Sequence, residues 1–351
     1  MEFNYWTSNM TTVVCNKCGK RRNGFSYNVT CECGGIFSIQ PEFKFRSEHI
    51  WENFPYLKRI NSLGECETPL ISFDKMSMKL EYFSPTYSYK DRGSRALISW
   101  LSQNLDKGSV IKEDSSGNAG ASIAAYGNAA GFETHIFVPE HAVREKLAQI
   151  ESYGAHIHKI PGSREDVTRA AQEYDGYFAS HVLNPEFRDG MRMISYEIFK
   201  QIGRTRIPTI YLPLSAGTLF LGIVSGFEHL YSSGEIESVP RFVVVQPEYV
   251  SPICSTINNI KQAETDFKDS IADALVSRKP ALAEMIIQKI KEHGSLCVSV
   301  SEDQIINARK KLALMGFFVE YSSATVLAAY EKLGHSERAL LIMTGNGLKN
   351  L

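Results

Sequence analysis

The sequence lacks an excess of charge of either sign, and it lacks long apolar runs. Its 351 residues carry a formal net charge of −1, so no overall basic field indicates nucleic-acid binding. No apolar stretch reaches the roughly 18 residues of a membrane-spanning helix. Residues 1–14 lack the basic start and the apolar core of a signal peptide. We therefore expect a cytoplasmic protein with no nucleic-acid partner and no membrane partner.

The chain does have the length and the apolar content for two or three folded domains. Its residues are 43% hydrophobic, which is enough for a sizeable core. Short apolar strands alternate with helical patterns in two series, whereas residues 261–294 are charged and irregular in pattern. The expected strands cover residues 109–114, 134–140, 155–162, 177–180 and 241–247. Residues 209–218 are expected to be a strand that enters a loop, and two more strands begin near residues 295 and 338. This alternation predicts two open α/β units with a ligand cleft at the carboxyl ends of the strands.

Four of the seven cysteines cluster near the start of the chain in the pattern C-x2-C, twelve residues, C-x-C. They are Cys15, Cys18, Cys31 and Cys33. Four thiolates on two tight turns are typical of a closed structural zinc site, and we favour metal binding over disulfides here. One alternative is a related knuckle that no longer binds metal. The basic residues 17 and 20–22 would allow nucleic-acid contact, but a solvated face explains them more simply.

One lysine stands in an unusual setting. The stretch SPTYSYKDRG, residues 84–93, places Lys90 after several hydroxyl side chains and directly before an acid, a base and a glycine. A lysine that is withdrawn from water in such a loop can act as a reactive amine. The alternative is a solvated lysine in a surface turn.

Two strand-to-helix loops have the composition of anion-binding sites. SSGNAG at residues 115–120 precedes a small-residue helix whose free amides would hold a carboxylate, and Asn118 adds a side-chain donor. LSAGT at residues 214–218 contains no Walker sequence, but its backbone amides would suit a phosphate. The cradle residues are Ser215, Ala216, Gly217 and Thr218. The alternative for the first loop is an ordinary capped helix start.

A third loop, MTGNGLKN at residues 343–350, places the hydroxyl of Thr344 at a strand end, although a simple glycine turn would have the same composition. Together the loops supply an amine, a phosphate cradle, a carboxylate site and a neutral hydroxyl. Pyridoxal phosphate needs a lysine for covalent attachment, a cradle for its phosphate and a partner for its ring nitrogen. The combination therefore predicts pyridoxal 5'-phosphate as the cofactor.

These motifs resemble those of threonine synthase and related fold-type II pyridoxal-phosphate enzymes of the tryptophan synthase beta superfamily. PTYSYKDRG resembles the family's lysine motif PTGSFKDRG, SSGNAGAS its asparagine loop, and SAGTLFLG stands where the family has its phosphate loop. FVEYSSATVLAA resembles its EPSSA segment, TGNGLK its C-terminal TGxGLK, and GECETPL its TPL entry segment. Cysteine knuckles also occur in some threonine synthases. The motifs span residues 15–349 in family order.

The resemblance assigns roles by position. Lys90 would hold the cofactor covalently and then move protons at substrate carbons. Asn118 would contact the ring hydroxyl of the cofactor, and Thr344 would face its pyridine nitrogen. The cofactor phosphate would be held by Ser215, Ala216, Gly217 and Thr218. The substrate carboxylate would be held by Ser115, Ser116, Gly117 and Ala119.

The resemblance also implies an architecture and an assembly. It implies a homodimer whose chains each carry two open, twisted α/β domains, with the cofactor in the cleft. The zinc-ribbon-like N-terminal segment would cover residues 1–45. The large cofactor-binding domain would combine residues 46–85 with 195–351, and the small domain would cover residues 86–194.

The sequence departs from the family pattern in the cofactor loops. Tyr87 occupies a position where the family has glycine, and Tyr89 replaces its phenylalanine. Ser215 and Ala216 stand where glycines are frequent. A phosphate cradle tolerates such changes because the backbone amides do the binding.

The larger departures concern a second phosphate, that of O-phosphohomoserine, which threonine synthases bind. The residue after Asn118 is alanine instead of a hydroxyl residue, and Phe187 stands where the family has a phosphate-binding arginine. The neighbouring Arg188 is the expected substitute, with His181 and Arg192 as further candidates. A site without a bidentate arginine loses strong charge-assisted hydrogen bonds.

Three functions are therefore open. The leading one is a threonine synthase-like lyase that converts O-phospho-L-homoserine and water to L-threonine and phosphate. The second is a threonine or serine dehydratase, or a β-replacement synthase with an O-phosphoserine-type substrate, which needs no long phosphate pocket. The third is a cofactor-binding homologue without catalysis, against which the intact Lys90, Asn118 and Thr344 argue. Both enzymatic functions require a small amino-acid substrate.

Overall fold

The computed structural model of the chain describes residues 11–142, 144–204, 206–261, 267–334 and 338–350. The chain folds as two compact units. Unit 1 consists of Met1–Glu65, Lys90–Met193 and Ser232–Glu235, and unit 2 consists of Cys66–Tyr89, Ile194–Tyr231 and Ile236–Leu351. No helix formed by the described residues is long and apolar enough to cross a membrane. Most of the segment used for the signal-peptide expectation, residues 1–10, lies outside the described residues.

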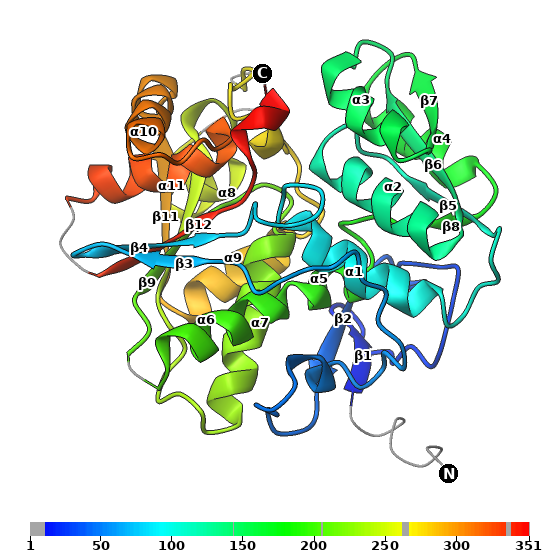
Figure 1. The fold of residues 1–351 in the computed structure, drawn as a ribbon, viewed down its shortest axis with the longest axis horizontal. Coiled ribbons are helices and arrows are strands. Elements are labelled where there is room, and N and C mark those ends of the chain that lie inside the picture. Colours follow the sequence, from blue (N-terminus) through cyan, green and yellow to red (C-terminus); the bar gives the residue numbers. More distant parts are fainter. Residues whose placement is uncertain (1–10, 143, 205, 262–266, 335–337, 351) are drawn as a thin grey trace. The chain divides into compact units, whose positions relative to one another are not determined.

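The main sheet of unit 1 is parallel and has four strands in the order β7-β6-β5-β8 (Figure 1). The strands are β5 (Val110–Glu113), β6 (Glu133–Pro139), β7 (His156–Ile160) and β8 (Tyr177–Phe178). The helices are α1 (Lys90–Leu101), α2 (Asn118–Ala130), α3 (Arg144–Ser152), α4 (Arg164–Glu173) and α5 (Pro185–Gly190). The predicted alternation of parallel strands and helices is confirmed for this part of the chain.

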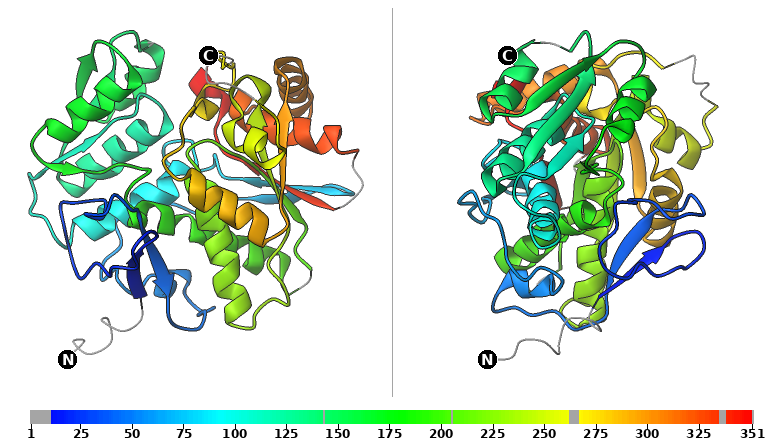
Figure 2. Two further views of the ribbon diagram at one scale, coloured as in Figure 1. Left: turned by 180° about the vertical axis from the view of Figure 1, so that it is seen from behind. Right: turned by 90° about the vertical axis from the view of Figure 1, so that its right-hand side faces the viewer.

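The N-terminal segment of unit 1 is a short antiparallel ribbon. β1 (Thr11–Cys15) pairs along its whole length with β2 (Phe37–Pro41), and Figure 2 shows the two strands side by side in blue. The loop between them turns at Gly19 and Gly34, whose φ angles are 70° and 74°. Glycine adopts this left-handed conformation without steric cost, and each turn follows one of the two cysteine pairs.

Unit 2 contains a six-stranded sheet in the order β11-β10-β9-β12-β4-β3, in which only the edge strand β3 is antiparallel. The strands are β3 (Leu70–Ser72), β4 (Met76–Leu80), β9 (Thr209–Pro213), β10 (Phe242–Pro247), β11 (Leu296–Val300) and β12 (Ala339–Met343). The helices are α6 (Arg192–Ile202), α7 (Thr218–Ser232), α8 (Pro252–Ile257), α9 (Ala283–Glu292), α10 (Glu302–Leu314) and α11 (Tyr321–Lys332). This is the second predicted α/β series.

Alternation along β10 explains how this sheet is covered on both faces. Val243 and Val245 pack into the core cluster that contains α11. Phe242 points to the other face, where its ring meets Phe220 and Phe227 of α7 at 5.7 and 6.3 Å. Successive side chains of a strand point to opposite faces. Because both faces are buried here, consecutive residues of the strand are apolar.

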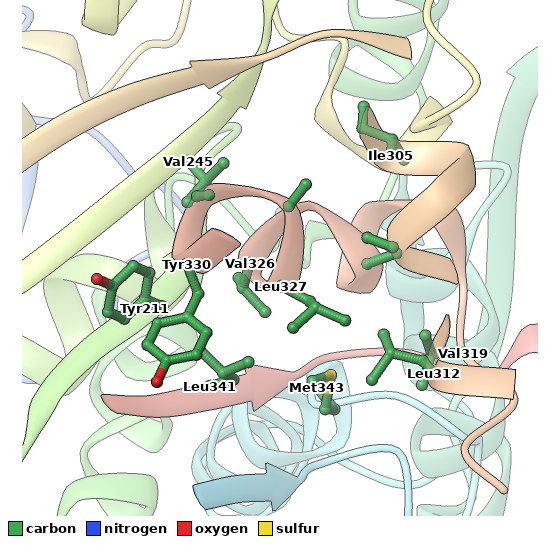
Figure 3. Close-up of a cluster of buried hydrophobic side chains, with 14 of the residues drawn as sticks. Tyr211, Val245, Ile305, Leu312, Val319, Val326, Leu327, Tyr330, Leu341 and Met343 are labelled. Atoms are coloured by element: carbon green, nitrogen blue, oxygen red, sulfur yellow. The ribbon is translucent and has the colours of Figure 1, made fainter. Parts of the chain in front are cut away.

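The cluster between α11 and the sheet fixes the carboxyl end of β12. Figure 3 shows Tyr330 of α11 next to Leu341 of β12, and Leu327 of α11 next to Met343 of the same strand. The ring of Tyr211 on β9 meets Tyr330 edge to face at 5.6 Å. The strand end that carries Thr344 is therefore supported by a packed core on the α11 side.

The segment 261–294 is more regular than its sequence pattern suggested. Its second half forms α9, in which Ile286 and Ile290 are buried, whereas residues 262–266 lie outside the described part. The many charged residues concealed an apolar stripe at helical spacing. The expectation of an irregular segment was wrong for residues 283–292.

The structure also contains a disulfide, between Cys254 of α8 and Cys297 of β11. Metal binding was favoured over disulfides for this chain, and this buried pair is an exception. The two cysteines are 43 residues apart in sequence. Their pairing depends on the packing of α8 beside β11, which their spacing alone does not indicate.

Candidate active site

Three loops of unit 2 lie at one edge of its sheet. The strands β9, β12 and β4 are adjacent and parallel, so their carboxyl ends meet at the same edge. The loops that follow them cover residues 214–217, 344–346 and 81–89. They contain the predicted phosphate cradle, the predicted hydroxyl of Thr344 and the segment that leads into Lys90.

The loop 214–217 has the properties of an anion cradle. It leads into α7, a 15-residue helix whose first amides have no acceptor within the helix. Among the described residues, none accepts a hydrogen bond from the amides of Ser215, Ala216 or Gly217. Gly217 has a φ of 92°, and a Cβ there would lie 2.3 Å from the Cδ1 of Ile286 on α9. This turn requires glycine, and its open amides fit a phosphate group.

Thr344 is buried directly after β12. Its hydroxyl pairs with the Ser323 hydroxyl at 2.8 Å, and the amides of Thr344 and Gly345 donate to the same Ser323 oxygen at 3.0 and 2.9 Å. The amide of Tyr89 donates to the Thr344 carbonyl at 2.9 Å. The segment that precedes Lys90 is therefore fastened to the end of β12.

Ser88 provides an orphaned polar atom in this segment. It forms an isolated antiparallel bridge with Gly345. Its hydroxyl is buried and has no hydrogen-bond partner within the described part of the chain. Such a group costs about 1–3 kcal/mol when it stays unpaired, so it is expected to bond to a ligand. Together with the cradle, this hydroxyl indicates that the residues present fit a phosphate-bearing cofactor.

Tyr87 adopts a backbone conformation that disfavours any residue with a Cβ. Its φ is 64°, and its side chain is 53% exposed. The family that this chain resembles has glycine at this position. A tyrosine here therefore strains the backbone, because its Cβ disfavours the left-handed conformation. The strained residue lies three positions before Lys90. Strained backbone residues often occur at functional sites.

We expect Tyr87→Gly to be more stable than Tyr87→Ala by about 1 kcal/mol, because only glycine relieves the left-handed strain. Both variants remove the ring, so the comparison isolates the backbone term. Urea denaturation of the two variants measures the difference. An alanine variant as stable as the glycine variant would show that the strain at position 87 is absent.

In unit 1, the loop 114–117 joins β5 to α2 and contains most of the predicted substrate residues. α2 begins at Asn118 without a side-chain cap, and the first amides of a helix have no acceptor within the helix, which suits an anionic ligand. A Cβ on Gly120 would lie 1.9 Å from the carbonyl oxygen of Ser115, so glycine allows the loop to fold back on the helix. The predicted carboxylate-binding residues brought together in this turn are Ser115, Ser116, Gly117 and Ala119.

We expect Gly120→Ala to lower the free energy of unfolding by about 1–3 kcal/mol and to displace the loop, because the added methyl overlaps the Ser115 carbonyl. Gly117→Ala is the matched control, since no atom lies within 4 Å of a Cβ at that position. It should change stability by no more than about 0.5 kcal/mol. Equal effects of the two variants in thermal unfolding would contradict the close approach.

Lys90 is the first residue of α1 and is half-buried. Its Nζ lies 5.8 Å from the centre of the Phe187 ring on α5. The two helices pack closely: a Cβ on Gly93 would lie 2.5 Å from that ring, and a Cβ on Gly190 would lie 2.3 Å from the Arg92 carbonyl oxygen. The fully buried Phe187 therefore gives the lysine an apolar wall.

A buried acid and a histidine lie in the same unit, within electrostatic range of Lys90. Glu113 ends β5, and its carboxylate accepts hydrogen bonds from the His181 amide at 2.9 Å and from the His181 Nδ1 at 2.7 Å. Burial raises the pKa of Glu113 to about 7, against the opposing effects of the His181 amide and of the charges on Arg164 and Lys90. Burial, and then the charge of Lys90, lower the pKa of His181 well below its usual value. The pair therefore favours a neutral imidazole.

Sequence reasoning missed Glu113 and considered His181 only as a phosphate ligand. A neutral imidazole whose Nδ1 donates to Glu113 offers an acceptor at Nε2, which suits a hydroxyl or a proton better than a phosphate. The available signal was the pair of acids that ends the strand VIKED, directly before the asparagine loop. Asp114, the second acid, accepts hydrogen bonds from Arg164 and Thr168 on α4.

The structure corrects the expectation that Arg188 binds substrate. Its side chain is buried, and its guanidinium donates to three backbone carbonyls of the same unit. These carbonyls belong to Phe37, Val182 and Leu183. The contact with Phe37 ties α5 to the N-terminal ribbon, and the Arg188 donors are used in this way instead of facing a ligand.

Arg192, the other arginine candidate, is also committed to the interior of unit 1. Its Nε and Nη2 donate to the Asp189 carboxylate at 2.5 and 2.7 Å, and Nη2 also donates to the Asn53 carbonyl at 3.1 Å. The side chain is fully buried. Neither Arg188 nor Arg192 therefore offers the bidentate phosphate contact that the family's arginine makes.

The four clustered cysteines come together at the end of the N-terminal ribbon. Their sulfur atoms all lie within 4.8 Å of one another, with 3.5 Å between Cys15 and Cys33 and 3.7 Å between Cys18 and Cys31. Four thiolates bound tetrahedrally to zinc at about 2.3 Å lie about 3.8 Å apart. A Cβ on Gly35 would meet the Cys15 sulfur at 2.3 Å, so glycine is required beside the cluster. The donor set fits a structural zinc ion.

Comparisons with known proteins agree with the geometry of both units. The family model for "Pyridoxal-phosphate dependent enzyme" matches residues 62–345. Threonine synthase from Methanocaldococcus jannaschii is 28% identical over 96% of this chain and 92% of the relative. Threonine synthase from Methanosarcina acetivorans is 27% identical over 97% and 93%. Among solved structures, maize serine racemase shares the fold with a TM-score of 0.69 at 22% identity, over 80% of this chain and 88% of that chain.

Proposed function

This chain belongs to the family of pyridoxal-phosphate dependent enzymes and has their fold-type II architecture, and we propose that it converts O-phospho-L-homoserine and water to L-threonine and phosphate. The family and the similarity to threonine synthases together support a pyridoxal-phosphate-dependent lyase. The observation that carries the narrower proposal is the similarity to threonine synthases, which spans nearly the whole length of this chain and of the relatives.

The cofactor, when bound, supplies an electron sink that stabilises negative charge on substrate carbons. In this proposal Lys90 attaches the cofactor and carries protons to and from those carbons. Ser215, Ala216, Gly217 and Thr218 hold the cofactor phosphate through their amides, and the first three of these amides have no acceptor among the described residues.

The remaining contacts follow from the loops described above. Thr344 faces the cofactor ring nitrogen with a hydroxyl whose partner is Ser323, so it is a neutral partner. Asn118 contacts the ring hydroxyl. The first turn of α2 holds the substrate carboxylate and thereby places the substrate carbons for proton transfer.

A second candidate is a serine or threonine dehydratase, or a β-replacement synthase for an O-phosphoserine-type substrate. One observation favours it: both arginine candidates for the substrate phosphate donate to groups inside unit 1. Ala119 and Phe187 likewise remove two phosphate contacts of the family. This candidate uses the same Lys90 and the same asparagine loop.

The two candidates differ in the products they form from defined substrates. The purified, cofactor-loaded chain would be incubated with O-phospho-L-homoserine, and phosphate and threonine would be measured together. Stoichiometric formation of both supports the first candidate. Absence of phosphate release, with a keto acid formed from L-serine or L-threonine or with turnover of O-phospho-L-serine, would replace it by the second.

We also propose that Cys15, Cys18, Cys31 and Cys33 hold one structural zinc ion. Elemental analysis of the purified chain should find about one zinc per chain, and Cys18→Ser should lose it and unfold at a lower temperature, because a structural zinc site contributes directly to folding. Cys66→Ser is the matched control, since Cys66 is an exposed cysteine outside the cluster. A parent chain without zinc, or a Cys18→Ser variant that keeps it, would contradict the proposal.

A further inference from the structure

Three histidines and a glutamate gather on one face of the unit 1 sheet. In the register of the parallel strands β6 and β7, His135 pairs with His156 and Phe137 pairs with His158. Glu133 precedes His135 by two residues, and alternate residues of a strand share a face. All four side chains therefore belong to the same face of this sheet, whose strands are labelled in Figure 1.

The opposite face of the same strands is occupied by α2. A Cβ on Gly127 would lie 2.6 Å from the Thr134 hydroxyl, and a Cβ on Gly120 would lie 3.2 Å from Ile136. Thr134 and Ile136 alternate with Glu133 and His135 along β6. The histidine cluster therefore faces away from α2, on the side where the ring of Tyr174, at the end of α4, packs 4.8 Å from that of His135.

The ligand atoms in this cluster are already close. The Nε2 of His135 lies 3.0 Å from the Oε1 of Glu133, and the Nε2 of His156 lies 3.9 Å from the same oxygen. One atom from each of the three residues falls within a 4.8 Å limit. Imidazole nitrogens and carboxylate oxygens bind zinc at about 2.0–2.2 Å, which puts neighbouring ligand atoms about 3.4 Å apart. Only small side-chain rotations separate the present arrangement from that geometry.

The three ligand side chains differ in their exposure to solvent. The side chains of His156 and Glu133 are 61% and 49% exposed, so both can rotate and an ion can enter from solvent. His135 is only 6% exposed at its side chain and is held by its neighbours. One fixed ligand and two adjustable ones leave the outer positions of the ion to water.

A second observation supports the site independently of the ligand distances. The Nδ1 of His135 lies 2.8 Å from the Nε2 of His158. If Nε2 of His135 binds an ion, its proton resides on Nδ1 and is donated to His158. Metal-binding histidines nearly always have such a partner on the other ring nitrogen, which fixes the tautomer and the ring orientation. The His158 ring is itself held by stacking on Phe137 at 4.5 Å.

One lysine side chain starts on the same face of the sheet as the cluster. Lys112 on β5 pairs with His135 across the sheet, so its side chain starts on the same face. Its ammonium donates to the Gln172 carbonyl at 3.0 Å and to the Tyr174 carbonyl. These two carbonyls hold the ammonium at the end of α4.

We propose that Glu133, His135 and His156 bind a divalent transition-metal ion of the zinc class, with His158 orienting the His135 ring. Two imidazoles and one carboxylate favour zinc and its neighbours over calcium or magnesium, which prefer all-oxygen sites. The site is distinct from the four-cysteine cluster in ligands and position in the sequence. It does not depend on the identity of the substrate.

The test is a calorimetric titration of Zn²⁺ into the full chain after its four-cysteine cluster has been loaded with zinc and excess metal removed. The parent should bind one additional ion, and the bound ion should raise the unfolding midpoint. His156→Ala should weaken this binding at least tenfold, and it should fold normally because the ring is exposed. His158→Phe should weaken it about 10–100-fold through loss of the orienting partner.

His141→Ala is the matched control, because His141 is an exposed histidine of the same unit outside the cluster. It should bind the additional ion as the parent does. No additional ion in the parent, or unchanged affinity in His156→Ala, would overturn the proposal. An additional ion that binds His156→Ala and His141→Ala equally well would show adventitious binding elsewhere and would overturn it too. If His158→Phe fails to fold, the comparison of His156→Ala with His141→Ala decides.

Discussion

Lys90→Ala should abolish turnover, with a fall in kcat of about 1,000-fold or more, because the variant loses both the covalent attachment of the cofactor and the proton carrier. The lysine begins α1 directly after Tyr89, which is bonded to the Thr344 carbonyl. The absorbance band of the bound cofactor should shift or disappear in the same variant. Steady-state assays with the true substrate and a visible spectrum measure both effects.

Lys107→Ala is the matched control for this result, because Lys107 is an exposed lysine of the same unit. Its turnover and its cofactor spectrum should equal those of the parent. A Lys90→Ala variant that keeps the cofactor band and measurable turnover would remove Lys90 from the site. A variant that loses the band but unfolds at the same temperature would locate the loss in the chemistry and not in the fold.

Much of this architecture could be predicted because it depends on short stretches of sequence. The parallel strands and the helices between them follow from apolar periodicity and from glycines at helix ends. The cofactor loops are local as well: Gly217 has a positive φ, which favours glycine at that position. The glycine could therefore be recognised in the sequence, although its contact with Ile286 of the distant helix α9 could not.

Features that depend on distant partners could not be predicted. Arg188 looks like a free cation beside a phenylalanine, but its donors are taken by carbonyls that include that of Phe37, 151 residues away. The Cys254–Cys297 disulfide likewise depends on the packing of α8 beside β11. α9 was missed because its buried stripe is narrow and its exposed face is highly charged. In each case tertiary packing decides what the local pattern leaves open.

The geometry at Glu113 leads to a pH dependence. As pH rises through about 7, Glu113 ionises and its two oxygens can accept both the amide and the Nδ1 proton of His181. The protonated acid loses part of this capacity and releases the ring. We therefore expect kcat/KM to rise with a pKa near 7, since the ionised form of Glu113 holds His181 in position within electrostatic range of Lys90.

Glu113→Gln should lower kcat/KM about 100-fold and flatten the profile near pH 7, because an amide offers only one acceptor to the two donors of His181 and does not ionise. Glu165→Gln, an exposed acid of α4, should keep the parent profile. His181→Asn tests the ring itself: it keeps a donor for Glu113 but removes the Nε2 acceptor, so it should lower kcat more than it raises KM. If Glu113→Gln lowers the unfolding midpoint yet retains the rise near pH 7, the pair only supports the fold and the titrating group lies elsewhere.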